Sequence, residues 1–250
     1  MADGTQPTAI VTAASKGIGA ACARELARRG YRLAIMARSD AILDVAGEIG
    51  AQAFQGDVTN TEDLARFVMG AHEHLGRIDA LVANTGLSTD NGGYDGSFFD
   101  SKRSASIVDY DDAFWIDMFD MQFMNVVRLA RLVTPIMKAQ GSGGIVNISA
   151  MISKEPHPAY PSSSTIRRAL DGYTKLYADR HARDGIRMNT LSPGFVSNIE
   201  WNEAQLDAVP MGRPVNPEEL ARIAAFLLSE DSAYITGQNI LADGGFNRGV

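Results

Sequence analysis

The sequence predicts a single α/β domain in which a doubly wound parallel sheet carries helices on both faces. Strand-length apolar runs alternate with segments of helical periodicity along the whole chain. The 250 residues suit one domain, 1–250, with a large buried core, and neither an internal repeat nor a linker divides them. The longest apolar runs have the length of strands, so we expect no membrane-spanning helix.

Each element is expected from its local pattern, in chain order. The first strand is the run Ala-Ile-Val-Thr, and the second is Arg-Leu-Ala-Ile-Met-Ala. The expected strands are 9–12, 32–37, 51–55, 81–83, 145–148, 186–191 and 239–242. The expected helices are 17–29, 40–49, 61–75, 110–139, 164–183 and 217–229. Ligands of such sheets bind beyond the carboxyl ends of the strands, so the segments that follow the strands are the ones to search for a site.

Composition excludes several classes of function. The chain has 23 basic and 30 acidic residues and a net charge of −7, so it has no basic excess to bind a nucleic-acid backbone. Cys22 is the only cysteine, which excludes an internal disulfide and a cysteine metal cluster, and we predict no metal site. The N-terminal residues show neither a cationic patch nor an apolar signal region, so we expect a cytoplasmic protein.

A glycine-rich turn connects the first strand to the first helix and is the strongest functional signal. We call residues 12–19 the phosphate turn. Its small residues let backbone amides approach an anion, and the following helix adds the partial positive charge of its N-terminus. Its position between a strand and a helix predicts a dinucleotide phosphate site. The expected contacts are Thr12, Ala13, Ser15, Lys16, Gly17, Ile18 and Gly19.

The phosphate turn resembles the TGxxxGIG motif of the short-chain dehydrogenase/reductase family, with Ala13 where the first glycine usually stands. Further matches follow in the family's order. Asp57-Val58 resembles the family's adenine-contacting Asp-Val, and Ala83-Asn84-Thr85-Gly86 resembles its NNAG motif in altered form. Ser192-Pro193-Gly194 resembles the Pro-Gly that borders the nicotinamide. Residues 235–238 and Asp243-Gly244-Gly245 resemble the family's C-terminal ending. The resemblance implies a Rossmann-like fold, a nicotinamide dinucleotide, a small-molecule substrate, and a homodimer or homotetramer packed through helices 110–139 and 164–183.

The residue after the second strand predicts which dinucleotide is bound. NAD needs an acidic residue there to bind the ribose hydroxyls, whereas this chain has Arg38. An arginine can bind a 2′-phosphate with charged hydrogen bonds, and Lys16 can add a second cation. We therefore expect NADP(H) in preference to NAD(H). By the same resemblance, Asn198 stands where the family often has a threonine that binds the nicotinamide amide.

The family's Asn-Ser-Tyr-Lys catalytic set is replaced at every position. The ungapped match of residues 167–189 to the family pattern aligns Arg167 with the Lys, Ser163 with the Tyr and Ala150 with the Ser, and Gln122 falls on the Asn. A serine hydroxyl is a far weaker acid than a phenol, and an arginine stays protonated at any working pH. Arg167 can still donate hydrogen bonds to the ribose. The resemblance therefore implies a non-standard active site.

Tyr160 offers another source of the proton. Divergent enoyl reductases carry their catalytic Tyr seven residues before the Lys, and Tyr160 stands seven residues before Arg167. Dienoyl-CoA reductases have a Ser at the usual Tyr position, as this chain has Ser163. We expect an NADP(H)-dependent oxidoreductase for an activated or conjugated carbonyl or enoyl substrate. A dinucleotide-binding protein without redox turnover and a non-redox lyase or dehalogenase are the alternatives.

A long polar loop insertion at 87–106 follows the fourth strand, near the expected active site. It is rich in Gly, Ser and Asp and contains Tyr94, Phe98 and Phe99. Loops of this length inside compact domains are usually functional or disordered. A lid whose aromatic residues touch the substrate is favoured over a flexible surface excursion.

Overall fold

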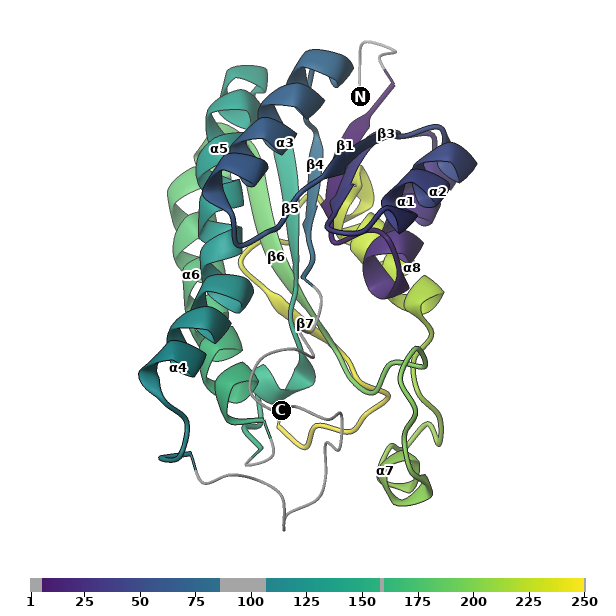
Figure 1. The fold of residues 1–250 in the computed structure, drawn as a ribbon, viewed down its shortest axis with the longest axis vertical. Helices are drawn as coiled ribbons and strands as arrows, with labels where there is room; N and C mark the ends of the chain where they lie inside the picture. The colour runs from purple at the N-terminus through teal and green to yellow at the C-terminus, as the bar shows by residue number, and fades with distance from the viewer. Residues whose placement is uncertain (1–5, 86–106, 158–159, 250) are drawn as a thin grey trace.

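A seven-stranded parallel sheet forms the centre of the molecule, in the strand order β3-β2-β1-β4-β5-β6-β7 (Figure 1). The computed structural model describes residues 6–85, 107–157 and 160–249. The strands are β1 Thr8–Thr12, β2 Arg32–Ala37, β3 Gln52–Gln55, β4 Ala80–Ala83, β5 Gly143–Ile148, β6 Ile186–Pro193 and β7 Asn239–Ala242. The strand order reverses beside β1, between β1 and β4, which confirms the doubly wound, Rossmann-like sheet.

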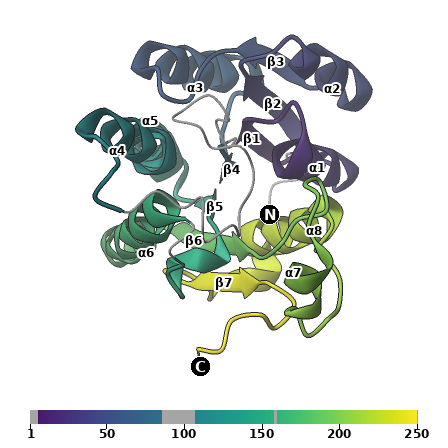
Figure 2. The same ribbon diagram turned by 60° about the horizontal axis from the view of Figure 1, so that its bottom comes forward.

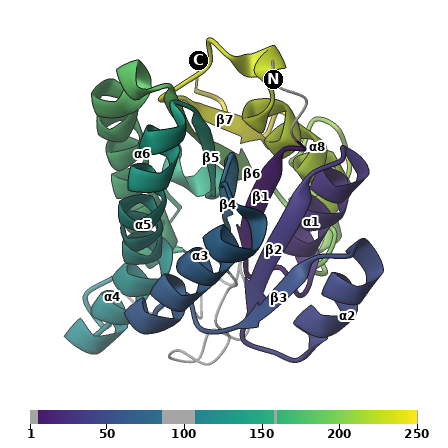
Figure 3. The ribbon, with the colours of Figure 1, turned by 90° about the horizontal axis from the view of Figure 1, so that it is seen from above.

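Helices cover both faces of the sheet (Figure 3). One face carries α1 Gly17–Arg28, α2 Ala41–Ile49 and α8 Pro217–Leu228, and the other carries α3 Thr61–Leu75, α5 Asn125–Gln140 and α6 Pro161–His181. Two buried apolar clusters fill the two helix–sheet interfaces, and Cys22 lies in the cluster under α1. Successive strand residues point to opposite faces of the sheet. Because helices cover both faces, the central strands are apolar on both sides.

The helix expected at 110–139 is wrong as a single helix. The structure has α4 Asp112–Phe119, a π-helical turn Asp120–Met124 and then α5. A π-turn contains a hydrogen bond over five residues instead of four, which rotates the side chains after it relative to those before it. No glycine or proline marks the break, so the sequence pattern gave no signal of it.

One expected helix begins earlier than predicted, and one short helix was not predicted. The helix expected from residue 164 begins at Pro161, where a proline suits the first helical position because its missing N–H has no intrahelical acceptor. A short helix, α7 Glu203–Asp207, was not expected; reciprocal hydrogen bonds between Asn202 and Gln205 cap its start. The loop insertion at 87–106 lies outside the described residues.

All carboxyl ends of the parallel strands meet at one edge of the sheet, which Figure 2 brings forward. Short segments after β1, β2, β5 and β6 line this edge, and α7 lies beyond it (Figure 2). Among the described helices, none is long and apolar enough to cross a membrane.

Candidate active site

The phosphate turn brings its backbone close to β4. Ala13 adopts a positive φ of 49°, and Gly17, with φ of 55°, begins α1. A Cβ on Gly19 would lie 2.3 Å from the Ala13 carbonyl oxygen and 2.7 Å from Asn84 Nδ2, so a side chain at this position would clash. The turn therefore needs glycine at position 19 for the close approach of helix and strand.

Hydrogen bonds hold the phosphate turn to the end of β4. Thr12 Oγ1 donates to the Asn84 carbonyl oxygen at 2.7 Å, and Asn84 N donates back to Thr12 Oγ1 at 3.0 Å. The Asn84 side chain donates through Nδ2 to the Ala13 carbonyl oxygen at 3.2 Å. The structure thus brings Thr12, Ala13, Gly19 and Asn84 together, whereas Gly86 lies outside the described residues.

Two oppositely charged residues stand at the ends of β2 and β3. Arg38 Nη1 lies 3.6 Å from Asp57 Oδ2; the Arg38 side chain is 64% exposed and the Asp57 side chain 36%. Thr59 donates twice to Asp57 Oδ1, from its N at 2.9 Å and its Oγ1 at 2.8 Å, which fixes the carboxylate. Val58 packs partly buried against the core under α3 and α5. An exposed ion pair contributes little to stability, so Arg38 can turn to another anion at small cost.

The loop after β6 reaches across to the first helix. Gly194 lies so close to β7 that a Cβ would meet the Asp243 Cα at 2.7 Å, and its N–H donates to the Ala242 carbonyl oxygen. Asn198, which is exposed, follows Gly194 by four residues. A Cβ on Gly17 would lie 3.0 Å from Asn198 Nδ2. The segment that begins at Pro193 therefore closes over the phosphate turn, and Asn198 lies beside Gly17.

Three of the candidate catalytic residues lie at or near the start of α6. Tyr160 is the N-cap residue and makes no side-chain capping hydrogen bond, whereas Ser163 and Arg167, four residues apart, lie on the same side of the helix. Tyr160 is 6 % exposed, and its ring centroid lies 5.7 Å from that of His157. Ser163 is half-buried in the first turn, and Ala150 is the second residue after the end of β5.

Arg167 is fully enclosed by the protein. It is 6 % exposed, and its Nη1 donates to the Ile148 carbonyl oxygen at 2.9 Å. Because a guanidinium keeps its proton at any working pH, this contact places a permanent positive charge at the carboxyl end of β5. Such a charge stabilises a nearby anion but does not transfer a proton.

The π-turn carries Gln122 into the interior. Gln122 is 3 % exposed, its Nε2 lies 3.6 Å from Met118 Sδ, and its Oε1 has no hydrogen-bond partner among the described residues. A buried amide oxygen without a donor is costly unless water or a ligand group meets it. The π-turn also contacts α6, so Gln122 belongs to the same side of the sheet as Arg167.

An aromatic cluster beyond the ends of β6 and β7 was missed by the sequence analysis. The Phe195 ring lies 4.7 Å from that of Trp201 and 5.3 Å from that of Phe246, and Trp201 Nε1 donates to the Val196 carbonyl oxygen at 2.8 Å. The cluster forms an apolar wall beside the carboxyl edge, with Met151 and Val209 buried in it. The signal was present in the sequence, because Phe195 directly follows Pro193-Gly194.

No metal chemistry is indicated by the described part of the chain. Within residues 6–85, 107–157 and 160–249, no group of three or more His, Cys, Asp or Glu side chains could hold a metal ion. The polar groups at the carboxyl edge include backbone amides, amide side chains, hydroxyls and arginines, which suit an anionic organic ligand, and the Asp57 carboxylate beside Arg38.

The fold, the phosphate turn and the residues after β4 and β6 define a short-chain dehydrogenase/reductase. The chain belongs to this family, because a family model described as Enoyl-(Acyl carrier protein) reductase matches residues 12–247. It is therefore an oxidoreductase of the short-chain dehydrogenase/reductase type.

Curated relatives match nearly the whole chain. The 3-oxoacyl-[acyl-carrier-protein] reductase FabG of Vibrio cholerae is 30% identical over 248 residues, which cover 95% of this chain and 96% of the relative. The protein of the same name from Staphylococcus aureus is 29% identical over 252 residues, covering 95% of this chain and 97% of the relative.

Solved structures show the same fold. YwfH, described as an NADPH dependent reductase involved in bacilysin biosynthesis, superposes with a TM-score of 0.87 at 28% identity, covering 98% of this chain and 100% of that chain. The TT0495 protein from Thermus thermophilus superposes with a TM-score of 0.83 at 31% identity, covering 97% of this chain and 99% of that chain.

Proposed function

We propose that this protein is an NADP(H)-dependent oxidoreductase that delivers its proton without the family's Ser-Tyr-Lys set. Arg38 carries the cofactor part of the proposal, because it stands at the end of β2 with an accessible guanidinium beside Asp57. The YwfH structure, which matches almost the whole chain, is described as an NADPH dependent reductase. The proposal of a different proton delivery rests on Ala150, Ser163 and Arg167, which stand where the family has Ser, Tyr and Lys.

The shape of the carboxyl edge suits a dinucleotide. The close approach at Gly19 packs the start of α1 against the segment after β4, and the positive N-terminus of α1 then lies at the carboxyl edge, where a pyrophosphate would bind. The phosphate turn, with Ser15, Lys16 and Ile18, would bind the pyrophosphate, Arg38 the 2′-phosphate, and Asp57 with Val58 the adenine. Asn84, Gly86, Arg167, Pro193, Gly194 and Asn198 would bind the nicotinamide half. When bound, NADPH supplies a hydride.

The protein's own residues then have to finish the proton transfer. The Ser163 hydroxyl is too weak an acid, and Arg167 does not release its proton. Tyr160 is the phenol at the N-cap of the same helix, seven residues before Arg167, and we propose that the Arg167 guanidinium approaches it closely enough at the bound substrate to favour a developing phenolate. We therefore assign Tyr160 as the proton donor, Arg167 as its electrostatic support, Ser163 as a hydrogen-bonding group to substrate and Gln122 as a polar contact at the site.

The substrate class follows from the missing donors. Loss of a positioned acid costs about 10²–10⁴ in rate, and loss of an oxyanion donor such as the one replaced by Ala150 costs a similar factor. Hydride addition to a conjugated enoyl group forms an enolate, whose charge is shared between carbon and oxygen, and an activated carbonyl forms an alkoxide that its own electron-withdrawing groups stabilise. Both need less support at the oxygen than the alkoxide of a simple ketone. We therefore propose such a substrate, with the apolar wall at Phe195 and Trp201 beside it.

Substrate-dependent NADPH oxidation tests the proposal. Conjugated enones and enoyl thioesters should consume NADPH, whereas simple ketones should not. The triple variant Ala150→Ser, Ser163→Tyr, Arg167→Lys should gain ketone reduction, because it restores the absent donors. Efficient ketone reduction by the wild type would contradict the proposed chemistry.

A second candidate function is dinucleotide binding without turnover. The observation that favours it is the same loss of donors at Ala150, Ser163 and Arg167. Tight NADPH binding, with no NADPH consumption across a panel of carbonyl and enoyl compounds, would establish it. A lyase or dehalogenase is less well supported, because such enzymes have no use for the retained phosphate turn.

We also propose a homodimer or homotetramer formed through α4, α5 and α6. Ile116 and Phe119 on α4 and Leu176 on α6 are 65%, 40% and 71% exposed, and these helices lie on the same side of the molecule (Figure 1). Large exposed apolar groups gathered on one side favour an interface. Ile116→Glu with Leu176→Glu should lower the mass measured by light scattering. Met69→Glu on α3, where Met69 is 57% exposed, is the matched control.

A further inference from the structure

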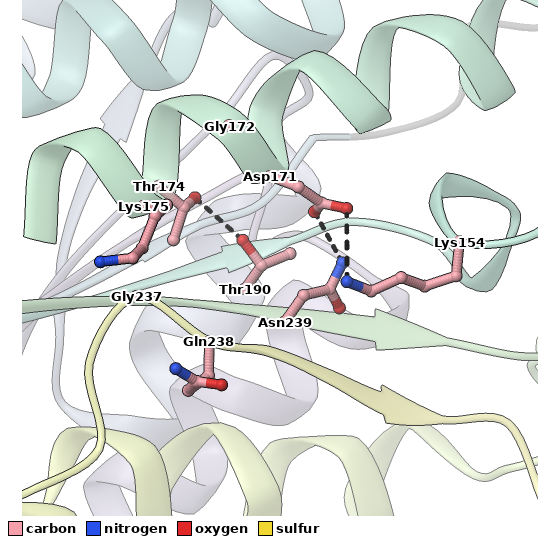
Figure 4. A pocket seen from close by; sticks show the side chains of 9 residues that line it. All are labelled: Lys154, Asp171, Gly172, Thr174, Lys175, Thr190, Gly237, Gln238 and Asn239. Carbon is pink, nitrogen blue, oxygen red and sulfur yellow. Dashed lines mark hydrogen bonds and ion pairs between the residues drawn. The ribbon is translucent and has the colours of Figure 1, made fainter. Parts of the chain in front are cut away.

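A polar cavity of about 340 Å³ lies between α6 and the edge strand β7 (Figure 4). Its walls include Lys154, Asp171, Thr174, Lys175 and Asn239. Strands β4, β5 and β6 separate it from the phosphate turn at the end of β1, so it is distinct from the dinucleotide site. The oxidoreductase function proposed above makes no use of these side chains.

One end of the cavity holds two oxygens in need of donors. Asn239 Nδ2 donates to Asp171 Oδ1 at 2.6 Å and to Ser153 Oγ at 3.1 Å. The other oxygens of the pair, Asp171 Oδ2 and Asn239 Oδ1, are buried and have no hydrogen-bond partner among the described residues. Buried acceptors without donors are rare in folded proteins and mark a place for water, an ion or a ligand group.

Lys154 stands at the same end of the cavity. Its Nζ lies 3.9 Å from Asp171 Oδ2, which is too far for a hydrogen bond. Burial raises the pKa of Asp171, and Lys154, Asn239, Ser153 and Arg168 oppose the shift. A cationic donor placed against Asp171 Oδ2 and Asn239 Oδ1 would stabilise the charged carboxylate, and an anion beside it would meet Lys154.

The cavity continues along two hydroxyls to a second lysine. Thr174 Oγ1 and Thr190 Oγ1 lie 3.0 Å apart in the middle, and Lys175 stands at the far end from Lys154 (Figure 4). Lys175 is 59% exposed, and its only ion pair among the described residues is with the exposed Asp179 one turn further along α6. The lining side chains Lys154, Lys175 and Asp171 therefore sum to one positive charge.

We propose that this cavity binds an acidic α-amino acid. The ligand's ammonium donates to Asp171 Oδ2 and Asn239 Oδ1, and its α-carboxylate meets Lys154. Its side chain lies along Thr174 and Thr190, and the side-chain carboxylate meets Lys175. The single negative charge of the ligand balances the single positive charge of the lining. A simple anion would leave the two buried oxygens without donors, and a simple cation would give neither lysine a carboxylate of the ligand.

Calorimetry on the full-length protein tests the site with L-glutamate and L-aspartate as probes. At least one of them should bind, and two analogues of L-glutamate separate the contacts. Glutarate lacks the ammonium, and L-glutamine lacks the side-chain charge; each should bind about tenfold or more weakly, the usual effect of one charged hydrogen bond. No heat with either acidic amino acid, or equal affinity for glutarate and L-glutamate, overturns the proposal.

Two variants map the binding to this cavity. Lys175→Met should remove the preference for L-glutamate over L-glutamine, and Asp171→Asn should remove the preference for L-glutamate over glutarate. Lys138→Met, at a half-exposed lysine on α5 outside the cavity, is the control and should change neither preference. NADPH affinity reports the folding of each variant and should stay at the wild-type value. Preferences that survive both variants also overturn the proposal.

Discussion

Arg167 on α6 donates a hydrogen bond through Nη1 to the carbonyl oxygen of Ile148, at 2.9 Å, where β5 ends. The contact ties a permanently charged side chain to the rigid sheet at the carboxyl edge. It also orients the helix face that carries Ser163 and begins at Tyr160. The proposed proton donor and its supporting charge are therefore held by one helix and one strand end.

Tyr160→Phe should lower kcat by about 10²–10⁴, because it removes the proposed proton donor and keeps the ring. NADPH affinity should stay nearly unchanged, since the phenol does not bind the dinucleotide in this proposal. Steady-state rates of NADPH oxidation with an enone substrate, beside NADPH titration by fluorescence, give both values. Tyr173→Phe on α6 is the matched control, because Tyr173 packs against Phe123 on the π-turn. An unchanged kcat in Tyr160→Phe would remove Tyr160 from the mechanism.

Arg38→Ala should weaken NADPH binding and leave NADH binding nearly as it is. A charged hydrogen bond to the 2′-phosphate is worth about 1.5–3 kcal/mol, which corresponds to a loss of affinity of about tenfold or more. Calorimetric titration of both dinucleotides measures the difference. Arg66→Ala is the matched control, since Arg66 is also exposed and forms an ion pair with Asp63 at the start of α3. Equal affinity of the wild type for NADPH and NADH would show that Arg38 does not select the cofactor.

The sheet and the phosphate turn were predictable because their signals are local. Apolar runs mark the buried strands, and the turn connects a strand to a helix within residues 12–19. The hydrogen bond between Asn84 and Ala13 joins residues 71 apart and was not predicted, although both residues follow neighbouring parallel strands. Because neighbouring parallel strands end at the same edge of the sheet, the strand order brings together segments that are far apart in the sequence.

Other features depend on contacts that the local pattern does not show. The π-turn Asp120–Met124 interrupts a helix whose periodicity continues on both sides, and it carries no glycine or proline. The hydrogen bond between Asp171 and Asn239 joins residues 68 apart on a helix and an edge strand. Each of these two residues taken alone is an ordinary polar residue, so only the packed structure reveals the cavity that they line.

Gly19→Ala should lower the free energy of unfolding by about 1–3 kcal/mol, the usual cost of forcing a group into a packed site. The added Cβ would meet the Ala13 carbonyl oxygen at 2.3 Å, so the turn has to shift, and NADPH affinity should fall with it. Urea unfolding and NADPH titration measure the two effects. Gly47→Ala on α2 is the control: a Cβ there has open space, and we expect a gain of about 0.5–1 kcal/mol. Equal stabilities of the two variants would contradict the close approach at Gly19.

Glu25 makes the stability of the protein depend on pH in acid. The hydrogen bond from Arg28, supported by Arg29 and opposed by burial, lowers the pKa of Glu25 from 4.5 to about 2. Between these two values the unfolded chain binds more protons than the folded one, so the free energy of unfolding falls as the pH falls through this window. Above pH 4.5 this contribution is fully present, and near pH 2 it is lost.

Glu25→Gln should therefore be less stable than the wild type at pH 7, and the difference should shrink as the pH falls from 4.5 towards about 2. Urea unfolding midpoints measured at intervals across this range give the two curves. Glu73→Gln, at an exposed glutamate on α3, is the matched control and should run parallel to the wild type. A Glu25→Gln curve that stays parallel to the wild type down to pH 2 would show that the ion pairs with Arg28 and Arg29 do not stabilise the folded protein.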